Sequence, residues 1–500
     1  MACPRRIYQL LIPSTEVQQW PTFMLPSELN QVAQFLGPIG DFKQIKSNNY
    51  LVEALVHLWD PECTAFRIGN RQMTITLEEV AGLFGLPTRG TALVFPFASD
   101  KAEFCQIIGL KESVLRGSDQ GVAVNILFER FAPRDGFERH VTDFVFTSKA
   151  VWERKRLLVY GVVMAGTYLF PRKDQKIAFK SAKIVNDLFL RIQGKQCSIV
   201  PTILADIFLA CTGCRKGEKF FHGANLVLYI WATEHFKRQA SVADSLPMVG
   251  YNWVITHPKR VNEGVLPKNA SECVDYLETL QDFNIRWVLD WTDCFEPILR
   301  TKESERVLLL GTQGIISYTP KRFLRQLGRI QGPPPISEFS EVTIFFDQGV
   351  CPKEIPMKSQ ITESWRTISD NRSIRYLPEL KQKGVMTAPY EDWLKDSTTQ
   401  GLQHEPYEEI EKLRAIIKAK DMEVVQLKKS IEVHKGKAEE NKRLYEKERE
   451  RRQEMKRKCG ELYDQADRVQ MPYARESKDS VLDRLRNFGD LVRNRLRDMM

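Results

Sequence analysis

The stretch TAFRIGNRQMTITLEEVAGLFGLP, from Thr64 to Pro87, carries the clearest structural information in the chain. Apolar residues alternate on both sides of Gly69-Asn70, a pattern that predicts a β-hairpin with a two-residue turn. Thr76 and Glu79 then have the spacing of a helix capping box, in which each side chain bonds the main-chain N–H of the other residue. The stretch therefore predicts a hairpin followed directly by a helix.

The end of that helix is encoded as clearly as its start. Gly85 can adopt the left-handed conformation that ends many helices, and Pro87 prevents the helix from resuming. None of these residues forms a catalytic pattern, so the unit predicts a scaffold and no activity. With the helical periodicity of the surrounding chain, it predicts a mainly α fold with a small β-hairpin near the N-terminus.

Composition sets wide limits on the class of protein. The 500 residues are 43% apolar and 10% aromatic, which is typical of globular proteins, and allow about two to four domains. The formal charge of +9 permits a nucleic-acid partner without requiring one. Ten scattered cysteines indicate reduced thiols and a nuclear or cytoplasmic location.

One apolar run resembles a membrane span. Residues 157–170, LLVYGVVMAGTYLF, lie between basic residues, but about 14 residues is the length of a buried core helix. The N-terminal sequence MACPRRIYQLLIPSTEV makes a poor signal peptide, because its apolar run is soon interrupted. We therefore expect no membrane association.

Changes in composition divide the chain into four parts. Residues 1–335 predict a globular helical core, which ends at a stiff Gly-Pro-Pro-Pro segment. Residues 336–404 predict an extension packed on the core or partly loop, with a possible strand at 342–346. Residues 405–470 predict a long coiled-coil helix, and 473–500 a C-terminal amphipathic helix. The candidate helices of the core span residues 27–36, 49–59, 76–84, 151–169, 176–192, 200–211, 225–238 and 271–283.

The coiled coil follows a seven-residue register without a break. One seam position holds Ile410, Ile417, Val424, Ile431, Ala438, Tyr445, Arg452, Cys459 and Ala466. The other holds Leu413, Lys420, Leu427, His434, Asn441, Glu448, Met455, Leu462 and Val469. The pattern is strong in the first half and degraded in the second. β-Branched residues at the first position with Leu at the second favour a parallel dimer, and the polar seam residues can fix register or partner.

A metal site has one set of weak candidates. Cys211 and Cys214 are separated by two residues, and His222 and His235 follow, so the four could in principle complete a zinc tetrahedron. The histidines do not have zinc-finger spacing, and buried free cysteine is common on apolar helices. The sequence therefore favours a structural role for these residues, with no metal or cofactor.

Familiar enzyme motifs are absent from the sequence. It contains no P-loop, G-x-G-x-x-G, G-x-S-x-G or H-E-x-x-H pattern. Asp290 and Asp293 could act as paired carboxylates, but the neighbouring Trp287 and Trp291 have the spacing of core anchors on a helix. No partner base or nucleophile accompanies the pair. We therefore expect a protein that is not an enzyme and has no small-molecule substrate.

Basic residues give the candidate nucleic-acid contacts. Lys321, Arg322, Arg325 and Arg329 punctuate TPKRFLRQLGRIQ, and on a helix they would form a charged face that can meet phosphates. The alternative is a solvated face that packs on acidic neighbours. A second cluster at residues 449–458 lies inside the coil, where it could be a nuclear localisation patch or ordinary coil charge.

Several segments, in order, resemble the plant mobile domain family, also labelled aminotransferase-like. They include MTITLEEVAGLFGLP, LLVYGVVMAGTYLFP, FFHGANLVLYIWATEHF and SYTPKRFLRQLGRIQGPPP, and the resemblance covers most of residues 25–396. It is closest to a compact, retroelement-associated branch. Departures include Val227 and Leu327, which stand at the family's Leu and Phe positions, and the coiled coil that follows.

The resemblance implies a transposon-derived plant protein, nuclear in location and without an accepted catalytic residue set. We therefore expect a nuclear binding or scaffold module linked to transposon silencing, genome maintenance or development, which dimerises through residues 408–469 and contacts chromatin, DNA or RNA. The alternative is a retroelement-encoded assembly protein without a nuclear role, located in the cytoplasm. An enzyme with an unrecognised site around Asp290 and Asp293 is the third hypothesis.

Overall fold

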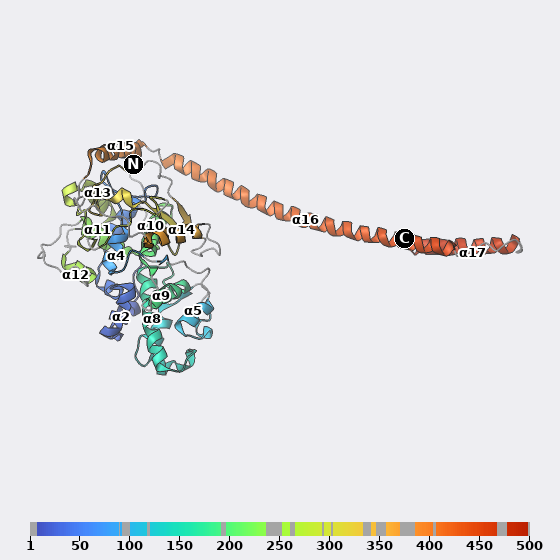
Figure 1. Ribbon diagram of the computed structural model, residues 1–500, viewed down its shortest axis with the longest axis horizontal. Coiled ribbons are helices and arrows are strands. Elements are labelled where there is room, and N and C mark those ends of the chain that lie inside the picture. Colours follow the sequence, from blue (N-terminus) through green and yellow to red (C-terminus); the bar gives the residue numbers. More distant parts are fainter. Residues whose placement is uncertain are drawn as a thin grey trace. The chain divides into compact units, whose positions relative to one another are not determined.

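The computed structural model (Figure 1) describes residues 8–498, except 90, 93–100, 118–120, 192–196, 237–252, 261–265, 293–294, 302–303, 334–341, 347–356, 371–385, 404–406 and 468–477. The chain divides into two compact units, residues 1–400 and 401–500. The first unit is mainly helical with short strands, and the second consists of long helices, as the sequence predicts.

The hairpin unit has the predicted form. Strand β2 (Ala65–Ile68) pairs antiparallel with β3 (Arg71–Met73), and Phe66 lies opposite Met73. Gly69 occupies the turn with a φ of 57°, a conformation that other residues adopt at a cost. A third strand, β1 (Trp59–Asp60), pairs with β2, although the sequence predicted a helix to residue 59.

Helix α4 (Leu77–Phe84) begins and ends as predicted. The N–H of Glu79 donates to Thr76 Oγ1 over 3.1 Å, and the N–H of Thr76 donates to a Glu79 carboxylate oxygen over 2.8 Å, which completes the capping box. Gly85 ends the helix in the left-handed conformation, with a φ of 62°. Every residue of α4 is buried, including both of its glutamates.

The other helices of the first unit include all the remaining candidates, with boundaries shifted by a few residues. They are α1 (Thr15–Gln19), α2 (Pro26–Leu36), α3 (Asn49–His57), α5 (Lys101–Ile108), α6 (Val124–Phe131), α7 (Gly136–Arg139), α8 (Lys149–Tyr168), α9 (Phe179–Arg191), α10 (Val200–Arg215), α11 (Asn225–Phe236), α12 (Trp253–Arg260), α13 (Ala270–Thr279), α14 (Lys358–Asp370) and α15 (Ala388–Gln403). Short 3₁₀ helices join them: η1 (Trp20–Phe23), η2 (Ile39–Gln44), η3 (Glu112–Leu115), η4 (Val141–Asp143), η6 (Asp282–Asn284), η7 (Asp290–Thr292) and η8 (Pro320–Phe323).

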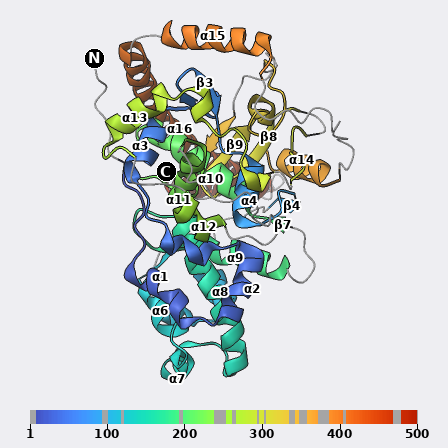
Figure 2. The same ribbon diagram turned by 90° about the vertical axis from the view of Figure 1, so that its left-hand side faces the viewer.

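Helices α2, α8 and α9 pack side by side (Figure 2). Helix α8 contains the apolar run that resembles a membrane span, and it is buried from Arg156 to Tyr168 within the core. Across the described residues, no helix combines the length and the apolarity that a bilayer crossing needs.

Small sheets complete the first unit. Strands β8 (Val307–Leu310), β9 (Gly314–Tyr318) and β10 (Thr343–Phe345) form an antiparallel sheet with β9 in the centre. The sequence predicted only the strand at 342–346, because β8 and β9 are buried and lack the alternation of a half-exposed strand. Two two-stranded pairs also form: β4 (Thr91–Ala92) with β7 (Cys197–Ser198), and β5 (Gly121–Val122) with β6 (Ile177–Ala178).

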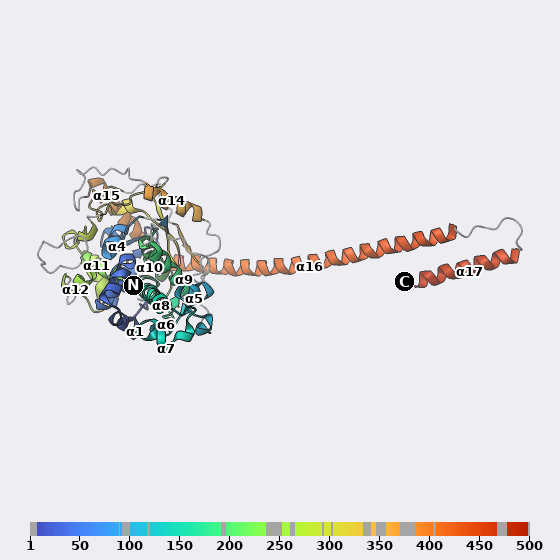
Figure 3. The same ribbon diagram turned by 60° about the horizontal axis from the view of Figure 1, so that its bottom comes forward.

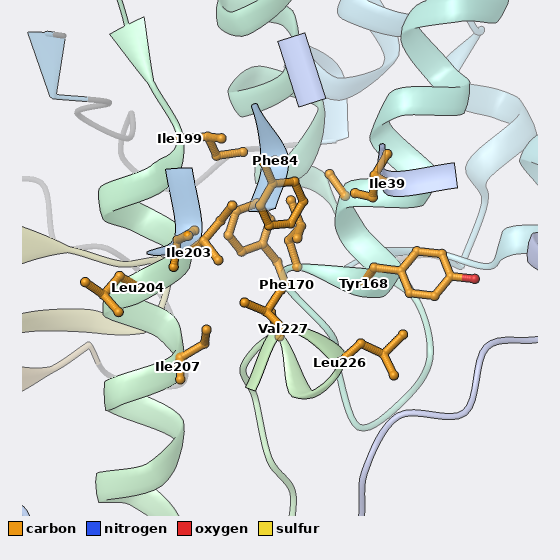
Figure 4. Close-up of a cluster of buried hydrophobic side chains, with 14 of the residues drawn as sticks. Ile39, Phe84, Tyr168, Phe170, Ile199, Ile203, Leu204, Ile207, Leu226 and Val227 are labelled. Carbon is orange, nitrogen blue, oxygen red and sulfur yellow. The ribbon is translucent and has the colours of Figure 1, made fainter. Parts of the chain in front are cut away.

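One large core holds the first unit together. Helix α10 contacts α3, α4, β8 and β9, so it joins the hairpin unit to the three-stranded sheet. Figure 4 shows the contact region, where Phe84 of α4 meets Phe170 beyond α8, Ile203 of α10 and Val227 of α11. The segment beyond residue 336 takes part as well, because Trp365 Nε1 of α14 donates to the carbonyl of Leu308 in β8 over 3.0 Å.

The second unit contains two helices, α16 (Tyr407–Asp467) and α17 (Lys478–Arg497). Helix α16 is continuous for 61 residues (Figure 3), and its described side chains between 426 and 462 are almost all exposed. This confirms the long C-terminal helix. The last seam residue of the predicted coil, Val469, lies outside the described residues.

Candidate functional site

The predicted basic face does not have the geometry that its sequence suggested. Arg322 belongs to the four-residue helix η8, and Arg325 lies in the turn that follows, so the residues do not share one face of a long helix. The two residues are only 4% and 5% exposed. The prediction that Lys321, Arg322, Arg325 and Arg329 form a solvent-facing helical surface is therefore wrong; whether the chain binds nucleic acid is a separate matter.

Internal partners explain why Arg325 is buried. Its guanidinium forms a two-pronged ion pair with the carboxylate of Asp282 and stacks over the ring of Trp287, with 3.6 Å between Cζ and the ring centroid. Arg71 of β3 donates to the same carboxylate over 2.9 Å. Because burying a charge requires a well-placed partner, these contacts stabilise the core.

The other members of the basic set also have protein partners. Arg322 Nη2 lies 3.4 Å from Gln72 Oε1 and 3.3 Å from Cys63 Sγ. Lys321 forms an ion pair with Glu305, and Arg329 is half-buried. Lys321 and Arg325 pack on acidic neighbours, as the alternative predicted, but Arg322 and Arg325 are buried and do not form the solvated face that it described.

The four weak metal candidates are not brought together. Cys211 and Cys214 are buried in α10, and burial raises the pKa of both thiols, that of Cys214 to about 12. A cysteine binds zinc as the thiolate, so an environment that raises the thiol pKa opposes binding. Burial also lowers the pKa of His222. In the described part of the chain, no group of three or more His, Cys, Asp or Glu side chains is arranged to hold a metal ion.

The carboxylate pair of the enzyme hypothesis is only partly described. Asp290 lies in η7, is half-exposed and forms an ion pair with Arg286, while Asp293 lies outside the described residues. The expected helix at this position is replaced by a 3₁₀ turn. Trp291 does anchor the core: it is 3% exposed, and its Nε1 donates to the carbonyl of Glu79 over 3.0 Å.

The most connected polar group is one that the sequence did not single out as a site. The Glu79 carboxyl group, on α4, is 2% exposed, accepts from two groups besides its own cap and contacts a third. Trp231 Nε1 of α11 donates over 3.0 Å, Gln326 Nε2 donates over 3.1 Å, and His235 Nε2 lies 3.0 Å away. We refer to Glu79, Trp231, His235 and Gln326 as the Glu79 cluster.

Hydrogen-bond directions in the Glu79 cluster follow from its fixed donors and acceptors. The N–H of Thr74 donates to Gln326 Oε1 over 3.0 Å, so the other end of this amide must donate, both to the Thr74 carbonyl and to Glu79. His235 Nδ1 lies 2.5 Å from the carbonyl of Arg286, which can only accept. Thr76, Trp231 and Gln326 therefore all donate to Glu79, and His235 connects Glu79 to the main chain at Arg286.

Glu78 is the immediate neighbour of Glu79 and has the opposite environment. It is 1% exposed, and it accepts a hydrogen bond from the N–H of Ile298 over 2.7 Å. Burial raises its pKa from the ordinary 4.5 to about 7. The two adjacent glutamates of α4 therefore have different environments in the same core.

A third buried carboxylate fixes the β8–β9 turn. Asp206 of α10 accepts from the N–H and hydroxyl of Thr312, over 2.7 and 2.6 Å, and from the N–H of Gln313. Burial raises its pKa to about 6. Asp206 therefore acts as a structural capping group between α10 and the sheet.

One arrangement has the geometry of a hydrolytic triad. His257 Nδ1 lies 3.0 Å from Glu234 Oε1, and His257 Nε2 lies 3.3 Å from Thr233 Oγ1. However, Thr233 is fully buried, and its hydroxyl lies within 3.0 Å of the carbonyls of Tyr229 and Ile230 in its own helix. In this conformation the Thr233 hydroxyl is directed at its own helix, so Thr233, Glu234 and His257 form a structural arrangement rather than a catalytic one.

Comparison with known proteins identifies one family. The family model described as "Domain of unknown function (DUF7745)" matches residues 24–399, which is most of the first unit. No curated protein and no solved structure matches the chain. The description assigns no activity and does not mention the plant mobile domain family, so that resemblance stays a prediction.

Proposed function

The chain belongs to the family of domains of unknown function DUF7745, whose match ends before α16. We propose that the protein is a non-enzymatic scaffold that associates with a second copy through α16. The observation that carries the proposal is the exposed apolar seam of that helix. In the first unit, the buried charged groups described above are used for internal packing.

The seam is exposed where its sequence is most apolar. Val424, Leu427 and Ile431 are 47%, 56% and 54% exposed, and their spacings of three and four residues place them on one side of α16. Isolated helices are marginally stable in water and gain most of their stability by packing an apolar face. A second copy of α16 supplies a matching face.

Charges beside the seam support a parallel dimer in this half. In a parallel pair, Glu423 on one flank of the seam faces Lys428 on the opposite flank of the partner helix, which is an attractive contact. Val424 and Ile431 at one seam position, with Leu427 at the other, are the combination that favours two parallel strands.

The resemblance to the plant mobile domain family supports a nuclear scaffold linked to transposon silencing, genome maintenance or development. The second candidate is a retroelement-encoded assembly protein, for which the same exposed seam is the supporting observation. The two differ in the size of the assembly: a scaffold of the first kind forms dimers, whereas an assembly protein forms larger, concentration-dependent particles.

Sedimentation velocity of the full chain tests the proposal. We expect wild-type dimers and monomers for Leu427→Glu. Burying one leucine contributes about 2 kcal/mol, so two copies contribute about 4 kcal/mol, or roughly a thousandfold in the dissociation constant. Val433→Glu is the matched control, because Val433 is 57% exposed on the same helix but lies outside the seam.

The sedimentation results distinguish the dimeric scaffold from the assembly protein. A wild-type monomer at micromolar concentration, or equal losses in Leu427→Glu and Val433→Glu, would refute dimerisation through the seam. Particles larger than dimers that disappear in Leu427→Glu would favour the assembly protein.

A further inference from the structure

The second half of α16 differs from the first in its charge. Between residues 435 and 458 the seam and its two flanks form one half of the helix surface, which we call the basic face. It carries eight cations: Lys435, Lys437, Lys442, Arg449, Arg451, Arg452, Lys456 and Lys458. Its one acidic residue is Glu448, which pairs with Arg452 over 3.3 Å. The opposite half of the helix carries most of the glutamates.

The basic face is accessible along its length. Lys435 is 69% exposed in its side chain, Arg452 is 74% exposed, and Tyr445 between them is 76% exposed. The ion pairs within α16, such as Lys435–Glu432 and Lys458–Glu454, join residues of the same exposed helix. Such pairs are weak and exchange readily for other partners.

A second copy of α16 is a poor partner for this half. In the parallel pairing that suits the first half, Lys437 would face Lys442 of the other helix, and Arg451 would face Lys456. Three of the six seam residues here, Asn441, Glu448 and Arg452, are polar or charged, so this half offers less apolar area than the first half to offset the repulsion. The smaller apolar area also counts against an acidic helix as the partner.

We propose that the basic face of α16, residues 435–458, binds the phosphate backbone of duplex DNA. Compared with an acidic helix, duplex DNA has the higher charge density, with one phosphate per about 1.7 Å of its axis. Its major groove also admits an α-helix. The face is about 35 Å long at 1.5 Å per residue, which is about one turn of the duplex. The inference goes beyond dimerisation, because a single helix carries the whole face.

Fluorescence anisotropy of the full chain with a labelled duplex of about 20 base pairs, across a salt series, tests this inference. The test variant combines Lys442→Gln, Arg449→Gln and Lys456→Gln. The matched control combines Arg443→Gln, Lys447→Gln and Arg457→Gln, which removes the same charge from the opposite half of the same helix stretch. Glutamine preserves helix propensity, and circular dichroism confirms that both variants stay helical.

We expect the test variant to lose at least about tenfold in affinity at low salt, and its salt slope to fall by about 2.7, because each lost phosphate contact contributes about 0.9. The control should retain most of its affinity and slope. Equal losses in both variants, no wild-type binding at low salt, or tighter binding to single-stranded RNA of the same length would each overturn the assignment. Leu427→Glu separates this inference from dimerisation, since it should change the mass of the protein and keep DNA binding.

Discussion

Two adjacent buried glutamates should respond in opposite ways to the same substitution. Glu79 accepts from Thr76, Trp231 and Gln326 and contacts His235. Glu78 accepts a hydrogen bond from the N–H of Ile298, and burial raises its pKa to about 7. Replacing each by glutamine removes a carboxylate of equal size and nearly equal burial, so the environments alone decide the result.

Glu79→Gln should destabilise the core by about 3 kcal/mol. The new amide oxygen can still accept from Thr76 and Trp231, but the amide nitrogen then faces Gln326 Nε2, which is itself a donor. A buried donor without an acceptor costs about 1 to 3 kcal/mol, and charge-assisted bonds add about 1.5 to 3 kcal/mol when lost.

Glu78→Gln should be neutral at pH 5 and stabilising at pH 8. The folded-state pKa lies above the ordinary value of 4.5, so the stability that Glu78 contributes is present below pH 4.5 and is lost as the pH rises through about 7. A difference of about 2.5 pKa units corresponds to about 3 kcal/mol. Glutamine does not ionise, and it can keep the bond from the N–H of Ile298.

Urea denaturation of the full chain at pH 5 and pH 8, followed by tryptophan fluorescence, measures both effects. We expect the wild type and Glu78→Gln to converge at pH 5 and diverge at pH 8, with Glu79→Gln below both at each pH. Equal shifts for the two variants, or an unchanged midpoint for Glu79→Gln, would refute the assignment of different environments to the two glutamates of α4.

Two further predictions concern packing and the buried arginines. Gly82→Ala should destabilise by about 1 to 3 kcal/mol in thermal denaturation, because an added Cβ would lie 2.4 Å from Trp291 Cδ1 and 2.5 Å from its carbonyl oxygen; Gly436→Ala in the open helix α16 should stabilise it slightly. Arg325→Ala should cost about 1.5 to 3 kcal/mol in urea denaturation, because it removes the charge-assisted bonds to Asp282, which is 40% exposed and keeps Arg71 as a partner, while DNA affinity measured at a temperature where the variant is folded stays at the wild-type value.

The parts of the fold that could be predicted are those encoded by neighbouring residues. The hairpin turn at Gly69, the capping box of Thr76 and Glu79, and the helix end at Gly85 each depend on residues a few positions apart. The long helix α16 follows from a repeat of seven. For such elements the physical cause lies within the segment itself, so periodicity and turn chemistry are sufficient evidence.

The prediction of the site was wrong where the partners of a residue lie far from it in the sequence. Arg322 and Arg325 have a spacing that suits an exposed helical face, but Asp282, 43 residues before Arg325, gives it a buried partner. Glu79 was recognised only as a cap, because Trp231 and His235 are 152 and 156 residues away. The sequence signal that could have pointed to the Glu79 cluster is the four-residue spacing of Trp231 and His235, which places both on one side of α11.

The Glu79 cluster joins three of the segments on which the resemblance to the plant mobile domain family rests. MTITLEEVAGLFGLP contributes Glu79, FFHGANLVLYIWATEHF contributes Trp231 and His235, and TPKRFLRQLGRIQ contributes Gln326, so three segments far apart in the chain meet in one buried network. Segments that hold the core together carry information about the fold and little about a ligand. The family match ends at residue 399, whereas α16 begins at Tyr407, so membership transfers no role to that helix. Dimerisation and DNA binding must therefore be measured on α16 of this chain, and the variants of the seam and of the basic face separate the two.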